Sequence, residues 1–195
     1  MKQGGEKGKN EVPLTIKDLD FRFENSLVKI IANRNQPEIK LAGLTVGPFE
    51  EGNEYEVYYW IAETLTESGI AHFREEVRLE ASDLYKVQWK ERVQVAGQIA
   101  ELPDDFYSKL RRYLVQLKKE MSKQPEKMQE YEKARQLASD IVNSRLKKIV
   151  ALSSGPSQAD QIVKKMAVEE RLIYEQLGRI VTEWRTRILE YEERE

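Results

Sequence analysis

The first third of the chain groups its apolar residues in short runs, which is typical of strands. Runs rich in β-branched and aliphatic residues predict strands at 26–32, 39–41, 44–46, 54–57 and 70–73. A helix is predicted from Tyr58 to Ser68, with Gly69 at its C-terminal end. The pattern therefore predicts a small β-rich domain over residues 26–75.

Glycine and proline mark the chain reversals inside this domain. Gly47, Pro48 and Phe49 separate two short apolar runs, and Gly52 follows closely. Proline fixes its own φ and disfavours helical backbone in the residue before it, so Gly47 is expected to be extended. Gly52 is expected to adopt a positive φ, which glycine does without strain. These residues predict turns and not chemistry.

Beyond residue 76 the apolar residues recur with the 3.6-residue period of amphipathic helices. Helices are predicted from a Ser82 N-cap to about residue 99, from an Asp104 N-cap, from Pro125 to about residue 152, and from the Ser157-x-x-Asp160 capping pattern to the C-terminal end. The stripe on the last helix comprises Met166, Ile173, Leu177, Ile180, Trp184 and Ile188. Short connections between long amphipathic helices predict a helical bundle over residues 76–195. The expected fold class is α+β, and residues 1–25 are expected to form a disordered or extended tail.

The charge balance changes this picture little. The chain has a net charge of −2, divided as −4 in residues 1–75 and +2 in residues 76–195. Nucleic-acid-binding domains usually carry a much larger basic excess, so the composition does not indicate one.

The sequence also limits the cellular compartment. Without any cysteine, disulfides, thiolate catalysis and cysteine-based zinc sites are excluded. The longest uninterrupted apolar run covers residues 57–62, whereas a membrane-spanning helix needs about 20 residues. Residues 1–11 lack the apolar segment of a signal peptide. The expected location is the cytoplasm, near the nucleoid in a prokaryote, or the nucleus in a eukaryote.

Few residues are candidates for catalysis or metal binding. His72 is the single histidine, so it has neither a second histidine nor a cysteine with which to share a metal. Adjacent carboxylates occur at Asp104-Asp105, at Glu75-Glu76 and at Glu169-Glu170, where helix capping explains them. The glycines do not form a phosphate-binding loop. We therefore expect no enzyme activity, no catalytic residue, no metal and no cofactor.

Two basic clusters have alternative explanations. The first is a candidate for DNA contact, although one charged face is ordinary on a solvated amphipathic helix. It comprises Lys109, Arg111, Arg112, Lys118 and Lys119. The second, at Arg145, Lys147 and Lys148, lies deep inside a predicted helix, where Arg145 is expected to pair with carboxylates across the bundle.

Motifs in both predicted domains resemble those of GINS subunits, which accompany the replicative helicase. In the small domain the resemblance rests on residues 28–32, Ile39, Leu41, Gly47-Pro48-Phe49, Gly52, Val57, Trp60, Ala62 and Leu65. In the bundle it rests on residues 102–107, Leu110, Tyr113, Arg145-x-x-Lys148-Ile149, Tyr174, Leu177 and Ile188. Family members often have Pro-Leu before the tryptophan, where this chain has Tyr58-Tyr59. The order of the domains resembles that of GINS subunits with the small domain first.

The resemblance implies a non-enzymatic scaffold that bridges the MCM helicase with a RecJ-family protein and connects unwinding to primase or polymerase. The length is similar to that of an archaeal subunit, which would form a two-plus-two tetramer with a large-domain-first GINS subunit. DNA contact would be weak or indirect, and no membrane is implied.

The resemblance also suggests residues for protein contacts. In the bundle, Tyr107, Tyr113, Trp184 and Tyr191 are candidates for the subunit interface, because aromatic residues favour interface cores. In the small domain the candidates are Phe49, Tyr59 and Trp60. The bundle aromatics would equally serve the core of their own domain, and for Trp60 ordinary burial preferences favour the core of the small domain.

Two other functions remain open at this stage. One is an unrelated helical adaptor or nucleic-acid-binding protein, which salt-dependent DNA binding would favour. The other is an enzyme whose site is completed by a partner chain, which a tightly bound metal would favour.

Overall fold

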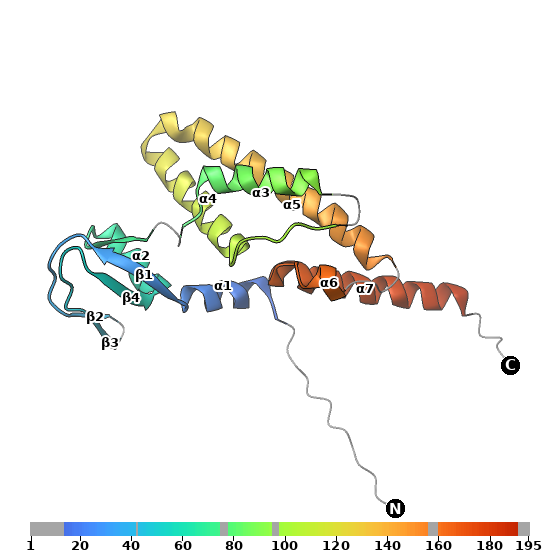
Figure 1. The fold of residues 1–195 in the computed structure, drawn as a ribbon, viewed down its shortest axis with the longest axis horizontal. Coiled ribbons are helices and arrows are strands. Elements are labelled where there is room, and N and C mark those ends of the chain that lie inside the picture. Colours follow the sequence, from blue (N-terminus) through green and yellow to red (C-terminus); the bar gives the residue numbers. More distant parts are fainter. Residues whose placement is uncertain (1–13, 42, 75–77, 95–97, 156–159, 191–195) are drawn as a thin grey trace, which may run out of the picture.

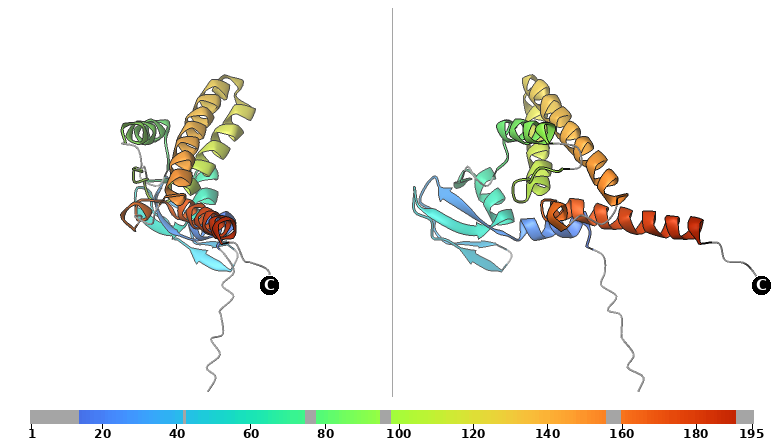
Figure 2. Two further views of the ribbon diagram at one scale, coloured as in Figure 1. Left: turned by 90° about the vertical axis from the view of Figure 1, so that its right-hand side faces the viewer. Right: turned by 45° about the vertical axis from the view of Figure 1, so that its right-hand side comes forward.

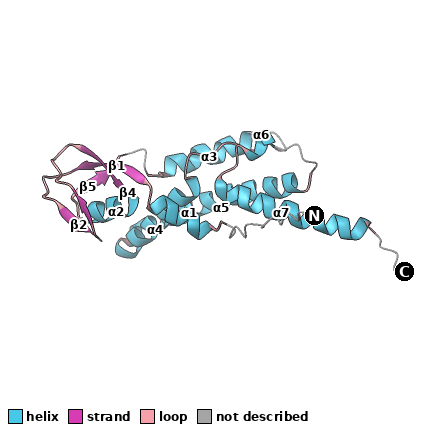
Figure 3. Cartoon of the chain, turned by 90° about the horizontal axis from the view of Figure 1, so that it is seen from below, coloured by secondary structure: helices cyan, strands magenta, loops and turns pink. Residues whose placement is uncertain are grey.

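The computed structural model describes residues 14–41, 43–74, 78–94, 98–155 and 160–190. A strand-containing N-terminal domain is followed by a helical bundle (Figure 1), which confirms the predicted α+β class. The small domain lies at one end of an elongated molecule, and the C-terminal helix extends to the other end (Figure 3).

The small domain is built on an antiparallel sheet with β1 (Leu27–Ala32) at its centre. β4 (Glu54–Tyr58) and β5 (Ala71–Phe73) pair with the two edges of β1, and α2 (Tyr59–Glu67) packs against this sheet. β2 (Ile39–Leu41) and β3 (Leu44–Val46) form a separate hairpin. The predicted strands and helix of this domain are all confirmed, with ends shifted by about one residue.

The core of the small domain follows from the alternation along β1. Ile30 and Ala32 are buried, whereas Leu27 and Lys29 on the opposite face are exposed. Such period-two burial is what a sheet covered on one face requires. The core is completed by Phe23, Phe49, Val57, Tyr59, Ile61, Ala62, Leu65, Ile70, Ala71 and Phe73.

The turn glycines agree with the predictions except at one position. Gly52 and Gly69 have φ values of +81° and +67°, as turn and helix-end glycines commonly do. The prediction of an extended Gly47 is wrong, because its φ is +93°. A Cβ at this position would lie 3.1 Å from Cδ2 of Phe49, so the ring of that buried residue folds back onto the turn.

The expected N-terminal tail is wrong for residues 16–24, which form α1 (Ile16–Glu24). Thr15 and Asp18 form a capping box: the Thr15 amide donates to the Asp18 carboxylate at 2.8 Å, and the Asp18 amide donates to Thr15 Oγ1. The Thr15-x-x-Asp18 spacing is a signal for the start of a helix that could have been recognised in the sequence. Residues 1–13 lie outside the described part of the chain.

Among the described residues, four long helices form the second domain, together with the short α6 (Asp160–Val163). α4 (Phe106–Lys123) and α5 (Met128–Ser153) form a hairpin through a 3₁₀ turn at Pro125–Lys127. α3 (Ala81–Val93) lies beside α5 on the outside of this hairpin, and α7 (Val168–Leu189) crosses near the C-terminal end of α5 (Figure 2). The buried apolar residues of this domain include Leu84, Val87, Ile99, Phe106, Leu110, Leu117, Ile141, Ile149 and Met166.

The bundle confirms the expected helices but corrects several ends. Glu80, not Ser82, is the N-cap of α3, because its amide donates to Asp83 at 3.1 Å, and the helix ends at Val93 instead of residue 99. α4 follows Asp105, whose φ is +53°, instead of an Asp104 cap. The C-terminal segment is divided into α6 and α7, and the expected Ser157 cap lies outside the described residues.

Candidate functional site

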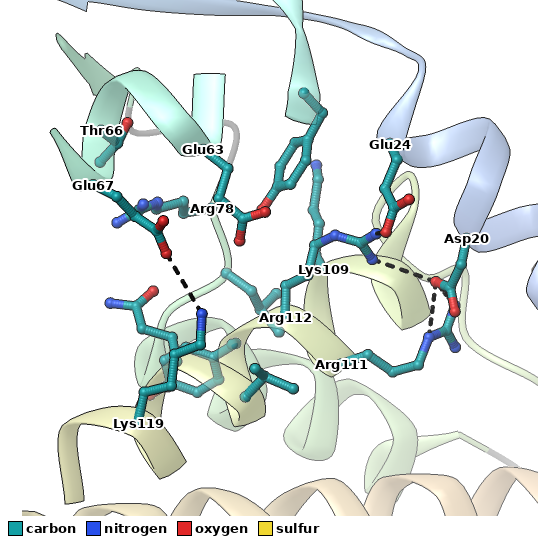
Figure 4. Close-up of a pocket in the computed structure, with 15 residues that line it drawn as sticks. Asp20, Glu24, Glu63, Thr66, Glu67, Arg78, Lys109, Arg111, Arg112 and Lys119 are labelled. Atoms are coloured by element: carbon teal, nitrogen blue, oxygen red, sulfur yellow. Dashed lines mark hydrogen bonds and ion pairs between the residues drawn. The ribbon is translucent and has the colours of Figure 1, made fainter. Parts of the chain in front are cut away.

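The two domains meet at a charged junction between α1 and α4. Asp20 Oδ1 accepts hydrogen bonds from Arg111 Nη2 at 2.7 Å and from Arg112 Nη1 at 3.3 Å. Arg112 Nη2 also donates to Glu24 at 2.8 Å. Figure 4 shows Asp20 and Glu24 on α1 facing the two arginines of α4. One carboxylate bridging two arginines ties the small domain to the bundle.

Aromatic contacts hold Arg112 in place at this junction. Its guanidinium carbon lies 4.7 Å from the ring centre of Phe23 and 5.2 Å from that of Tyr59, at cation–π distance. Beside these residues a cavity of about 570 Å³ opens between α1, α2 and α4, and Lys119 and Glu67 approach to 3.5 Å across it (Figure 4). Its lining carries charges of both signs, which fits a junction between domains better than a site for one charged ligand.

The ion pairs also change the acidity of Asp20. Partial burial raises its pKa, but the hydrogen bond and charge of Arg111, and then those of Arg112, outweigh burial and hold the pKa below its usual range. The unfolded chain therefore takes up a proton at a higher pH than the folded chain does. The stabilisation is complete above the ordinary carboxyl pKa of about 4 and is lost as the pH falls through the lowered value.

An Asp20→Asn variant is expected to lose about 1 kcal/mol of unfolding free energy at pH 7, because the amide keeps a hydrogen bond but not the charge. The difference from the unmodified chain should shrink as the pH falls from about 4 through the lowered pKa of Asp20, because the carboxylate becomes protonated first in the unfolded chain and then in the folded chain. Urea unfolding followed by circular dichroism at several pH values measures it. Glu183→Gln, on the exposed side of α7, serves as the control. An equal loss at pH 7 and at pH 2 would contradict the assigned role of the charge.

A second charged cluster is buried inside the bundle around Arg145 on α5. Its guanidinium is fully buried and pairs in a bidentate manner with Glu170 of α7, at 2.7 Å for Nη2. Nη1 donates to Glu91 of α3 and to the carbonyl of Ala100, both at 2.8 Å. The cluster therefore connects α3, α5, α7 and the segment before α4, and it confirms that Arg145 pairs with carboxylates across the bundle.

Neighbouring side chains complete this cluster. Lys148 forms an ion pair with Glu91, and the Tyr107 hydroxyl donates to Glu170 at 2.6 Å. Burial raises the pKa of Tyr107, and the charge and hydrogen bond of Glu170 raise it further, so the phenol stays protonated. Burial lowers the pKa of Arg145, but the hydrogen bonds and charge of Glu170 outweigh it, so the guanidinium stays charged. With the opposite charges satisfied inside the protein, the cluster positions helices and is not arranged for proton transfer.

The third feature is an apolar surface on α7. Ile180, Trp184 and Ile188 are each more than 60% exposed, and Leu189 is 80% exposed. Their spacing of four and then four residues places the first three along one side of the helix. Figure 2 shows the C-terminal half of α7 projecting beyond the other helices. Three large apolar side chains in a row on a projecting helix are typical of a protein–protein interface. We call Ile180, Trp184, Ile188 and Leu189 the α7 surface.

The structure separates the candidate interface residues into groups. Phe49 and Tyr59 are buried in the core of the small domain, so the expectation that they contact a partner is corrected. Trp60 is partly buried against the same core, and Tyr107 and Tyr113 are partly buried in the bundle. Trp184 is exposed on the α7 surface. Tyr191 lies outside the described residues.

The candidate DNA-contacting residues do not form one free basic face. Arg111 and Arg112 are engaged with Asp20 and Glu24, and Lys119 lies beside Glu67. Lys118 is exposed and Lys109 is partly buried at the junction. The carboxylates of α1 were missed in the sequence, because α1 was taken for part of a tail.

Among the described residues, no group of three or more histidine, cysteine, aspartate or glutamate side chains is placed to hold a metal ion. None of the described helices combines the length and apolar character needed to cross a membrane.

Comparison with protein families agrees with the two-domain architecture. Residues 15–73 match the family model of the PSF2 N-terminal domain, and its start at residue 15 includes α1. Residues 76–189, more than half of the chain, match the GINS complex protein helical bundle domain. The chain belongs to the GINS family. It is a PSF2-like GINS subunit with the small domain first, which confirms the resemblance seen in the sequence. GINS is a DNA replication complex. None of the curated proteins is similar enough to this chain to count as a match.

Within this GINS subunit the three features have different roles. The α1–α4 junction fixes the small domain against the bundle, and the Arg145 cluster fixes the helices of the bundle. The α7 surface is directed outward. Of the three, the α7 surface is the one whose apolar side chains are exposed to solvent.

Proposed function

We propose that this GINS subunit is a non-enzymatic scaffold of the replicative helicase assembly. It bridges the MCM helicase with a RecJ-family partner and connects unwinding to primase or polymerase. Membership of the GINS family supports the role in DNA replication. The specific partners follow from the resemblance described above.

The observation that carries the scaffold role is the α7 surface. A monomer that left Ile180, Trp184, Ile188 and Leu189 in water would lose the free energy gained by burying them, about 1.5 to 3 kcal/mol for each large apolar side chain. A partner subunit that covers this surface recovers that free energy. Tryptophan is also among the residues that contribute most to protein interfaces.

The partner that we propose for the α7 surface is a GINS subunit of the large-domain-first type, in a two-plus-two tetramer. The small domain and the bundle are joined through α1 by ion pairs. Because this junction restrains the small domain, one subunit would present its surfaces to its neighbours in a defined relative orientation. A replication scaffold needs such an orientation.

The direct test mixes the purified full chain with a purified large-domain-first GINS subunit and measures the mass of the complex by light scattering coupled to size exclusion. A mass equal to two copies of each chain is the expected result. Adding MCM should then give a larger complex that retains both GINS chains. If the chain remains a monomer at concentrations well above 10 μM and retains no MCM, the scaffold proposal is overturned.

Direct DNA binding is the alternative function, and the same preparation tests it. Affinity for duplex DNA that falls steeply with salt would indicate several phosphate contacts. The ion pairs of Arg111 and Arg112 with α1 argue against strong DNA binding, because the carboxylates of α1 already compensate those charges. We therefore expect weak or no binding at physiological salt.

A further inference from the structure

The outer side of α3 carries a second apolar surface, separate from the α7 surface. Trp89 is 66% exposed, and Tyr85 and Val93 on the same helix are also exposed. The three residues follow one another at intervals of four, so they form a continuous row about 12 Å long at 1.5 Å per residue. Figure 2 shows α3 at the outside of the bundle, away from α7. We call Tyr85, Trp89 and Val93 the α3 surface.

The folding of α3 does not require these side chains. The opposite side of the helix buries Leu84 and Val87 in the bundle core, and Glu91 enters the Arg145 cluster. Tyr85, Trp89 and Val93 instead line the solvent side, where a shallow hollow of about 630 Å³ contacts all three. A helix that is anchored on one side and apolar on the other has a surface to offer a partner.

The charges around this surface are mainly basic. Lys90 and Arg92 are exposed, and neither forms an ion pair with any of the described residues. Lys86 pairs with Asp83 at 3.0 Å. At the Tyr85 end the balance is mixed, because Lys133 lies over the Tyr85 ring and Glu132 lines the neighbouring hollow. At the other end Arg92 shares a hollow with Asp140 of α5, so the unpaired positive charge of α3 is that of Lys90 and Arg92, on either side of Trp89.

We propose that the α3 surface is a docking site for an acidic amphipathic helix of a partner protein. Apolar side chains of that helix would pack on Tyr85, Trp89 and Val93, and its carboxylates would face Lys90 and Arg92. A row of anchors spaced by one helical turn matches the helix-in-groove mode of recognition. The charge complementarity identifies the partner as acidic. This site goes beyond the subunit interface on α7 and does not depend on it.

A nucleic acid fits the same surface less well. Neutralising several successive phosphates needs a longer row of cations than Lys90 and Arg92, with Lys86 already paired. Val93 adds apolar area that a backbone contact would not use.

The test measures binding of three fluorescein-labelled peptides to the full chain by fluorescence anisotropy. The peptides are 18-residue amphipathic helices with one shared leucine face, and their polar positions are all glutamate, all glutamine or all lysine. The glutamate peptide is expected to bind at least tenfold more tightly than the other two. Trp89→Ala should weaken its binding at least tenfold, and Lys90→Glu with Arg92→Glu should reverse the preference to the lysine peptide. Both variants alter exposed side chains, so their thermal unfolding should match that of the unmodified chain.

The control is Trp184→Ala, which truncates an equally exposed tryptophan on α7 and should leave glutamate-peptide binding unchanged. Loss of binding in Trp184→Ala with retention in Trp89→Ala would overturn the proposal and assign the peptide to the subunit interface. Equal affinity for all three peptides would overturn it as well. Tighter binding of a 20-nucleotide single-stranded DNA, sensitive to Lys90→Glu with Arg92→Glu, would replace the acidic helix by a nucleic acid. None of these outcomes depends on whether the GINS tetramer forms.

Discussion

Arg145→Met is expected to destabilise the bundle by about 3 to 5 kcal/mol, the usual cost of removing one partner from a buried ion pair. Arg145 is 0% exposed, and its removal would leave Glu91 and Glu170 as buried carboxylates without their shared cation. Methionine fills a similar volume, so loss of charge and not loss of packing dominates the effect. Urea unfolding followed by far-ultraviolet circular dichroism measures the change in free energy. Such a loss is a large part of the 5 to 15 kcal/mol that stabilises an ordinary domain.

Two comparisons separate this explanation from general damage to the core. Arg187→Met removes an arginine from an exposed pair with Glu183 and should cause no measurable loss, because exposed ion pairs contribute little. Adding Glu170→Gln to Arg145→Met should recover part of the stability, since a neutral amide is cheaper to bury than a carboxylate, whereas Glu91 keeps its ion pair with Lys148 and is left unchanged. If the double variant Arg145→Met with Glu170→Gln is less stable than Arg145→Met, the loss does not come from the unpaired Glu170 carboxylate.

Ile180→Asp combined with Trp184→Asp is expected to weaken assembly with the large-domain-first GINS subunit by a factor of 100 or more. Truncating a central interface residue typically costs about 2 kcal/mol or more of binding free energy. Each factor of ten in the dissociation constant corresponds to about 1.4 kcal/mol, so the loss at two such positions exceeds a factor of 100. The aspartates would also place charges in an apolar contact. Light scattering of the mixed subunits over a range of concentrations gives the dissociation constant.

The matched control places the same charge on another side of the same helix. Arg179 is exposed, and helical spacing directs it away from the line of Ile180 and Trp184, so Arg179→Asp should leave assembly within a few-fold of the unmodified chain. All these variants should keep the circular dichroism spectrum and thermal midpoint of the isolated chain, because the altered side chains face solvent. Unchanged assembly of the double variant would remove the α7 surface from the interface.

The small domain shows which elements a local sequence pattern can predict. Runs of β-branched and aliphatic residues, together with Gly52 and Gly69, identified the strands, the turn and the end of α2, because these depend on residue type and on backbone freedom within a few residues. Arg145 was also assigned correctly, since an arginine deep in a bundle helix must find carboxylates. The order of the domains, and with it the GINS family, was likewise readable from the sequence.

The helix α1 shows where the local pattern was insufficient. It has nine residues, fewer than an isolated helix needs for stability in water, and Phe23 is its only buried residue. Its stability comes from partners far along the chain, through the contacts of Asp20 and Glu24 with Arg111 and Arg112 and of Phe23 with the Tyr59 ring. The ion pairs exist only once the small domain lies against the bundle, and the Phe23 contact only once the small domain has folded.

By itself, the sequence determined which residues are apolar, which elements other than α1 they form and in what order the two domains follow. Only the tertiary structure decided which apolar side chains are buried in this chain and which remain for a partner. Tyr59 and Trp184 were both expected at an interface, yet one lies in a core and the other in solvent. Periodicity identifies the apolar side of a helix, whereas burial depends on what the rest of the chain places against that side. α2 is covered by the sheet and α1, while the C-terminal half of α7 extends past every described helix that could cover it.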